Sequence, residues 1–138
     1  MSGGYLLVRV AGQSFGLPLA GVLAVDDLGA VLDVPHTGPA LRGLTPRRGR
    51  LLPLVHLGAL LAEGPPPAER GRAAVLVDLR GDGERIVALE VDDADEVVRE
   101  AALPVPAGEP LPCAQGVVRR DGGLVPILDL ARLGGRIG

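Results

Sequence analysis

Two segments of the chain carry nearly the same sequence 73 positions apart, residues 43–61 and residues 116–134. Weaker matches extend upstream, where Leu17 meets Leu89 and Val25 meets Val97. A period of about 70 residues exceeds that of a solenoid repeat, so the sequence predicts one supersecondary design used twice. The strongest equivalent positions are Gly43 and Gly116, Arg47 and Arg120, Gly49 and Gly122, Leu51 and Leu124, Pro53 and Pro126, Leu57 and Leu130, and Leu60 and Leu133.

Short apolar segments separated by Gly- and Pro-rich turns make up most of each copy, and no long helical pattern occurs. This spacing is typical of β-barrels and β-sandwiches, so we expect an all-β (mainly β) fold with short helices. A helical turn is expected at residues 39–44 and short helices at 57–62 and 129–133. Strands are expected at residues 5–10, 15–19, 22–25, 30–34, 51–55, 73–79, 85–91, 96–99, 114–119 and 124–128.

The chain has 138 residues, which fits a single domain. Prolines and glycines at residues 63–72 cannot continue a strand or a helix, so this segment is expected to link a first subdomain at residues 5–62 to a second at 73–134. Each copy alone would bury too little apolar surface, which predicts a hydrophobic seam shared between them. Tyr5 and Phe15 are the only aromatic residues, so that seam must be aliphatic.

Composition excludes several functional classes. All 14 basic residues are Arg and the net charge is -3, which provides no electrostatic surface for nucleic acid. Cys113 is the only cysteine, so no intrachain disulfide can form. The first residues do not form a signal peptide, and no apolar run approaches the roughly 18 residues of a membrane span. These features predict a cytoplasmic protein without direct membrane insertion.

The order of motifs resembles the CheW-like domain of bacterial chemotaxis over residues 5–134. The most specific pieces are Gly43–Leu57, with Arg48-Gly49 and Pro53, and Leu89–Val97, with Asp92. The resemblance implies two SH3-like five-stranded β-barrels packed around a shared seam. It also implies an adaptor without chemistry or cofactors. Its implied partners are the cytoplasmic tip of a methyl-accepting chemoreceptor and the regulatory domain of a CheA-type histidine kinase.

Three positions depart from the family pattern. Ala24 stands where a Glu is common, Thr45-Pro46 replaces Asn-Leu, and His56 replaces an Asp. We expect these changes to preserve the fold and to affect which partners the protein binds. The sequence is compatible with a role in flagellar chemotaxis and with a role in an alternative chemosensory pathway. It is also compatible with a degenerate family member that binds only one partner.

The expected recognition patch combines the strand at 22–25 with the Arg-Gly turn. Arg offers a planar fork of donors and is enriched in interface hot spots, while Gly49 allows a positive φ. A solvated hairpin, rich in Arg through codon bias, is the alternative interpretation of this turn. The residues expected to bind partners are Val22, Val25, Arg48, Gly49, Leu52 and Asp92.

Other candidate sites have simpler interpretations. His36 and His56 lack a Cys partner for a metal, and Cys113 is expected to be a small buried hydrophobe. The Arg80-Gly81-Asp82 tripeptide is expected to serve as a turn, and the carboxylates of residues 92–96 as a solvated charge run. No catalytic or metal-binding residues are therefore expected. A β-barrel ligand-binding module remains the alternative from another class, but it would need a polar-lined cavity where the sequence predicts aliphatic side chains.

Overall fold

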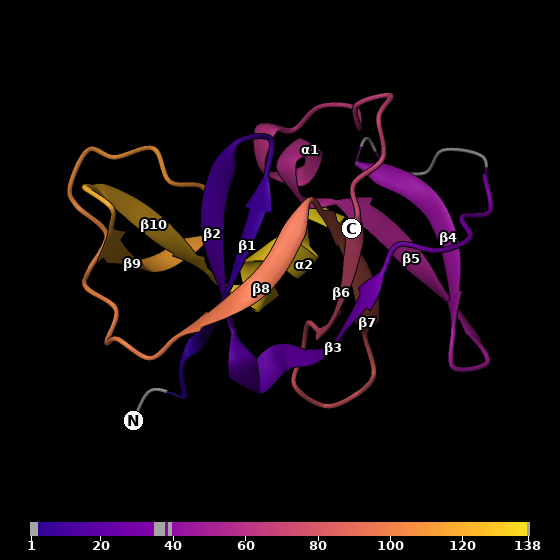
Figure 1. Cartoon of the computed structure of the whole chain (residues 1–138), viewed down its shortest axis with the longest axis horizontal. Coiled ribbons are helices and arrows are strands. Elements are labelled where there is room, and N and C mark those ends of the chain that lie inside the picture. Colours follow the sequence, from indigo (N-terminus) through magenta and orange to yellow (C-terminus); the bar gives the residue numbers. More distant parts are fainter. Residues whose placement is uncertain (1–2, 35–37, 39, 138) are drawn as a thin grey trace.

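The computed structural model describes residues 3–34, 38 and 40–137, which fold into two five-stranded sheets and two short α-helices. The sheets lie side by side along the long axis of the molecule (Figure 1). The predicted mainly β class is confirmed. The elements are β1 (Tyr5–Val10), β2 (Gln13–Pro18), η1 (Leu19–Gly21), β3 (Val22–Asp27), β4 (Leu41–Arg47), β5 (Arg50–His56), α1 (Leu57–Ala62), β6 (Ala73–Asp78), β7 (Ile86–Val91), β8 (Asp93–Val98), β9 (Ala114–Arg120), β10 (Gly123–Leu128) and α2 (Leu130–Ile137).

The two copies exchange their first hairpins. One sheet has the order β8-β1-β2-β10-β9 and the other β3-β6-β7-β5-β4. Since β1–β5 form the first copy and β6–β10 the second, each sheet takes two strands from one copy and three from the other. The chain changes sheet after β2, through the single turn of η1, and again between β7 and β8. The expected subdomain division at residues 63–72 therefore does not follow the sheets: residues 5–18 and 93–128 build one sheet and residues 22–91 the other.

One large, mainly aliphatic core cluster joins the sheets, as expected of a shared hydrophobic seam. Its largest cluster contains Val8 and Leu17 from one sheet and Val75 and Leu89 from the other, all fully buried. Leu57 of α1 and Leu133 of α2 belong to the same cluster, so both helices cover the seam.

The equivalent glycines Gly43 and Gly116 each lie where a connecting segment passes close to the strand that follows it. The segment after β3 bridges to β4 through Leu32 and Leu44, and the segment after β8 bridges to β9 through Leu103 and Val117. A Cβ on Gly116 would lie 2.9 Å from the Leu103 carbonyl oxygen, and one on Gly43 would overlap the Leu32 carbonyl. In each sheet, the connecting segment thus pairs with the strand that follows it through an isolated β-bridge. The strand expected at residues 30–34 is reduced to the bridge between Leu32 and Leu44.

Two-residue turns close three of the hairpins. Ala11-Gly12 has φ values of 53° and 75°, Arg48-Gly49 of 51° and 77°, and Asp121-Gly122 of 50° and 79°. Positive φ at both central residues defines the type I′ turn, whose twist matches that of the flanking strands. The turns predicted at Arg48-Gly49 and Asp121-Gly122 are therefore real and equivalent.

The helical turn expected at residues 39–44 is wrong for the part that the structure describes. Residues from Leu41 onward belong to β4, which pairs with β5 over its whole length. Gly43 and Pro46 make this strand difficult to predict from the sequence, because both are poor strand formers. Pairing with the apolar run Leu51–Val55 of β5 overrides the local preference.

A buried ion pair that sequence reasoning missed fixes the linker. Glu90 is fully buried and accepts two hydrogen bonds from Arg42, at 2.9 and 3.0 Å, and one from the Gly71 amide at 2.7 Å. Arg42 also donates to the carbonyl oxygens of Pro67, at 2.6 Å, and Glu69, at 3.2 Å. The linker is therefore held against β4 and β7.

Candidate functional site

The edge strand β3 presents an apolar face to solvent. Its side chains alternate between half-buried and exposed, and Leu23 and Val25 are 49% and 43% exposed. Val22, the other expected contact on this strand, is half-buried and packs against the core. An unpaired strand edge with exposed apolar side chains is a typical docking feature.

The β4–β5 hairpin tip is fastened to the end of β3. Arg47 forms an ion pair with Asp26 at 3.5 Å and donates a hydrogen bond to the Asp27 carbonyl at 3.0 Å. Arg48 and Gly49 are exposed at the tip, and Arg48 has no ion pair among the described residues. The structure therefore brings Val25 and Arg48-Gly49 to neighbouring parts of one surface. We call Leu23, Val25, Arg48 and Gly49 the β3 surface.

Asp92 lies at the edge of this surface. It lines a shallow depression of about 520 Å³ together with Val25 and Asp26. Its carboxylate also accepts a hydrogen bond at 3.2 Å from Ala11 in the β1–β2 turn. Asp92 thus supports a turn of one sheet beside strand β3 of the other.

Leu52 is not on the surface. Its side chain is 4% exposed and packs with Leu54 and Leu76 in a small core cluster. The exposed residue of this segment is Leu51, which is 55% exposed. Leu52 is therefore removed from the expected contact residues.

A second surface, equivalent to the first, lies on the other sheet. Val97 of β8 occupies the place of Val25 and is 47% exposed. Arg120, the counterpart of Arg47, forms ion pairs with Glu96 and Glu100 that fasten the β9–β10 tip to the β8 side. We call Val97, Glu96 and the tip Asp121-Gly122 the β8 surface. The repeat alignment already contained this signal, because it paired Val25 with Val97.

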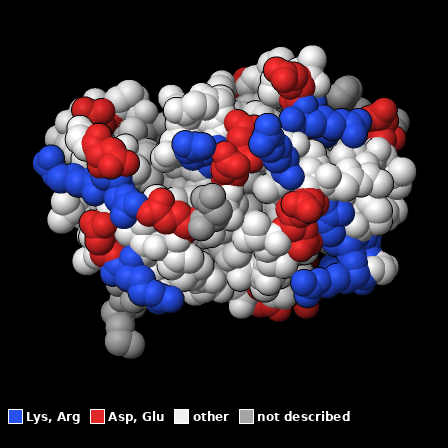
Figure 2. All heavy atoms as spheres, in the orientation of Figure 1, with Lys and Arg blue, Asp and Glu red and all other residues white. Residues whose placement is uncertain are grey.

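The two tips differ in charge. Arg48 and Asp121 have the same backbone conformation, with φ values of 51° and 50°, but opposite side-chain charges. Elsewhere on the face shown in Figure 2, positive and negative side chains are interspersed without a large field of one sign. Local charge at the tips, rather than a global field, distinguishes the two surfaces.

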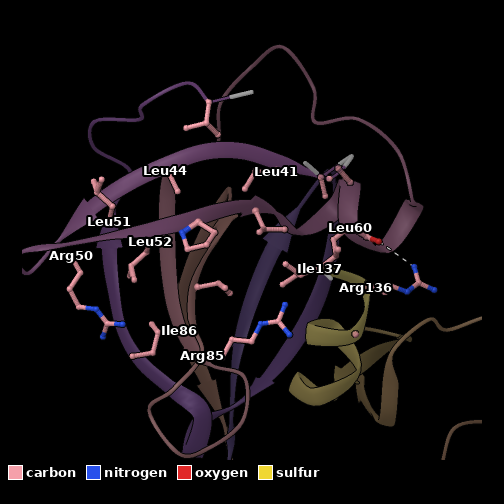
Figure 3. Close-up of a pocket in the computed structure, with 18 of the residues that line it drawn as sticks. Leu41, Leu44, Arg50, Leu51, Leu52, Leu60, Arg85, Ile86, Arg136 and Ile137 are labelled. Carbon is pink, nitrogen blue, oxygen red and sulfur yellow. Dashed lines mark hydrogen bonds between the residues drawn. The ribbon is translucent and has the colours of Figure 1, made fainter. Parts of the chain in front are cut away.

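A groove of about 850 Å³ lies between the β4–β5 hairpin and the end of α2 (Figure 3). Leu41, Leu44 and Ile137 line it, and Arg136 donates to the Leu61 carbonyl at 3.0 Å at one end. The interiors of the two sheets are instead filled by side chains such as Leu17, Leu54 and Ile127, each 0% exposed. This packing disfavours a ligand site inside the curve of either five-stranded sheet, neither of which closes into a barrel.

Two of the four residues that depart from the family pattern, Thr45 and His56, serve the fold. Thr45 is fully buried and donates to the Ala30 carbonyl at 3.0 Å. His56 caps α1, because its Nδ1 accepts a hydrogen bond from the Ala59 amide at 3.0 Å. Burial lowers the pKa of His56 below its usual value, an effect that Glu90 partly opposes. Only Pro46 is exposed, and Ala24 is half-buried.

No metal-binding cluster of His, Cys, Asp and Glu occurs among the described residues, which exclude His36. Burial raises the pKa of the Cys113 thiol and so disfavours the reactive thiolate. The Arg80-Gly81-Asp82 segment is a turn whose amides donate to the Asp78 carboxylate. Asp93 pairs with Arg9 at 3.1 Å, and Glu96 with Arg120, as expected of a solvated charge run.

A family model for the CheW-like domain matches residues 4–137. The chain belongs to this family. The scaffolding protein TtCheW from Thermoanaerobacter tengcongensis has a similar structure, with a TM-score of 0.80 at 20% identity over 96% of this chain and 92% of that protein. No curated protein matches the sequence significantly. In the part of the chain that the structure describes, no helix is long and apolar enough to span a membrane.

Proposed function

We propose that this CheW-like protein is a non-catalytic chemosensory adaptor that couples the cytoplasmic tip of a methyl-accepting receptor to a CheA-type histidine kinase. Family membership supports the adaptor class. Both partner segments in this proposal are cytoplasmic, so the protein acts there. Its role is to hold two partners in a fixed relation rather than to change either one covalently.

The pair of equivalent surfaces is the observation that carries the proposal. An adaptor must bind two partners at once, and this fold presents an apolar edge strand with an adjoining hairpin tip on each sheet. Val25 and Val97 provide the apolar centres, and Arg48 and Asp121 provide tips of opposite charge. Opposite charges at matched positions favour different partners, because like charges repel across an interface.

The β3 surface is the better defined of the two. Each side of a transient signalling contact buries on the order of 600–800 Å². Leu23 and Val25 can supply the apolar centre of such a contact, with Arg48 as its charged anchor. We assign one partner to this surface and the other to the β8 surface.

The experiment exchanges the turn residues between the tips. Arg48→Asp introduces the residue that the second hairpin carries at the same φ, and Asp tolerates positive φ better than Arg. We expect it to weaken capture of the partner at the β3 surface by about 2 kcal/mol and to change stability by about 0.5 kcal/mol or less. Asp121→Arg is the matched control and should leave that partner bound.

Binding is measured with the purified kinase regulatory domain and receptor tip, with melting curves for each variant. Weakening of one partner by Arg48→Asp and of the other by Asp121→Arg supports a two-sided adaptor. If only one of the two purified proteins binds at all, the chain is a degenerate member, the second candidate. If Arg48→Asp stays folded and binds both partners like the parent, the Arg-Gly tip is a solvated turn and the assignment fails.

A further inference from the structure

A second cavity, of about 740 Å³, opens beside α1, and its lining residues Ser14 and Leu124 border the depression at the β8 surface. Its walls come from the β1–β2 hairpin, α1, the linker and the segment before β9. The lining is mostly apolar and stiff, and includes Phe15, Pro67, Leu111, Pro112 and Pro126. Cavities of this volume with few polar groups are typical of small-molecule sites.

The walls of this cavity are held in place by hydrogen bonds within the chain. Arg42 fixes the linker wall through the Pro67 carbonyl at 2.6 Å and through its ion pair with Glu90. On the opposite wall, the Ala114 amide donates to the Leu111 carbonyl at 3.3 Å, and the Asp129 amide to the Cys113 carbonyl at 2.7 Å. The site is therefore preformed, which lowers the entropic cost of binding.

His56 supplies an unused hydrogen-bond donor at the cavity wall. Its Nδ1 accepts from the Ala59 amide, so the proton of the neutral imidazole must lie on Nε2. The side chain is only 5% exposed, yet among the described residues no acceptor bonds to Nε2. Among the described residues, Nε of Arg47, which is ion-paired with Asp26, is the fully enclosed side-chain atom that lacks a hydrogen bond. Nε2 of His56 lacks an acceptor but is not fully enclosed, so it retains accessible surface. A nearly buried donor of this kind has a strong preference for an acceptor.

The equivalent position in the second copy shows what His56 adds. Asp129 caps α2 through its carboxylate, which accepts from the Ala131 amide at 2.9 Å. At residue 56, the imidazole Nδ1 accepts the capping hydrogen bond as one carboxylate oxygen of Asp129 does. The Nε2–H group then provides a donor where a carboxylate would have its second acceptor oxygen. The carboxylates of Glu90 and Asp92 are close enough to act on the His56 ring electrostatically, and Arg42 is already paired with Glu90. This environment disfavours an anionic ligand.

We propose that the cavity beside α1 binds a small neutral molecule with an apolar body and a carbonyl oxygen that accepts a hydrogen bond from Nε2 of His56. The apolar part would pack against Phe15, Leu111 and Pro126. The ligand class is thus that of uncharged amides, esters, lactones and ketones.

The test is an amide ¹H–¹⁵N NMR titration of the full chain at pH 7.5 with acetanilide, a neutral amide with an aromatic body. We expect saturable shifts at residues around the cavity, with a dissociation constant in the low millimolar range for a ligand of about ten non-hydrogen atoms. N-ethylaniline replaces the carbonyl group by CH₂ and should bind about fivefold more weakly, as loss of one hydrogen bond predicts. Benzoate, which is anionic, should also bind more weakly.

A matched pair of variants locates the site. Leu124 lines this cavity and Leu51 lines the other groove at the equivalent position, and both are exposed enough to accept a larger side chain. Leu124→Trp should reduce acetanilide affinity at least about tenfold, whereas Leu51→Trp should leave it unchanged. Absence of saturation up to about 20 mM, equal binding of N-ethylaniline, or insensitivity to Leu124→Trp would each overturn the proposal.

Discussion

Separating the two halves of the chain should abolish folding, because the copies exchange their first hairpins. The fragments are residues 1–64 and 70–138, which divide the chain inside the linker. In the first fragment alone, β1 lacks its neighbour β8 and β2 lacks its neighbour β10. Likewise, β3 lacks its neighbour β6 and β5 lacks its neighbour β7. Neither sheet exists in either fragment.

The loss expected from three leucines alone is comparable to the whole stability of a small domain. In residues 1–64, Leu17, Leu54 and Leu57 are 0% exposed and pack in clusters that include residues of the other half. Re-exposing one buried leucine costs about 2 kcal/mol, so these three alone cost about 6 kcal/mol. Whole domains are stable by only about 5–15 kcal/mol. We therefore expect no cooperative unfolding transition in either fragment.

The assay is thermal and urea unfolding followed by circular dichroism, on each fragment and on an equimolar mixture. The mixture should recover strand signal and a cooperative transition, because all strand pairings between the copies become available again. A sharp transition in a single fragment at a concentration that keeps it monomeric would refute the exchanged arrangement of hairpins.

Three further predictions concern single residues. Gly116→Ala should lower the free energy of unfolding by about 1–3 kcal/mol because its Cβ would meet the Leu103 carbonyl, whereas Gly135→Ala, which meets nothing within 4 Å, should be neutral or stabilising. Glu90→Ala should cost about 3–5 kcal/mol by leaving Arg42 unpaired, against about 1 kcal/mol or less for Glu96→Ala at an exposed pair, as urea unfolding would measure. The pKa of His56 is lower folded than unfolded, so its contribution to stability is complete above about pH 6.5 and is lost as the pH falls below that value; His56→Ala should remove this dependence in unfolding curves at pH 7.5 and 5.5 and cost about 1 kcal/mol at pH 7.5.

The sequence carried the repeat, the class of fold and the turn positions, because these depend on local signals. Arg48-Gly49 and Asp121-Gly122 are turns wherever the strands beside them pair. Strand exchange is a different kind of property. The sequence of residues 5–18 does not determine whether the hairpin β1–β2 pairs with β5 or with its equivalent β10, because both strands contain a similar apolar run. Only the packing of the whole chain decides between them.

The candidate site was predictable to the same extent. Val25 and Arg48 are both exposed and their role in binding stays a prediction, whereas Leu52 is buried. The apolar run of β5 shows no alternation, so the sequence does not reveal which of Leu51 and Leu52 faces solvent, and a shift of one residue reverses the answer. The Arg42–Glu90 pair was equally invisible, because its members are 48 positions apart and each resembles an ordinary surface charge.

The hairpin exchange has a consequence for the proposed adaptor. The β3 and β8 surfaces lie on different sheets, so they cannot move apart without disrupting the core cluster that the two sheets share. The chain also changes sheet through the short η1 turn and at Asp92 alone between β7 and β8, which leaves little length for a hinge. A duplicated fold with separate halves would instead resemble two domains on a linker, whose relative motion is the default. For the proposed adaptor, a fixed spacing between its two proposed partner surfaces is the physical property that coupling requires, and the shared core with its two short crossings favours such a spacing.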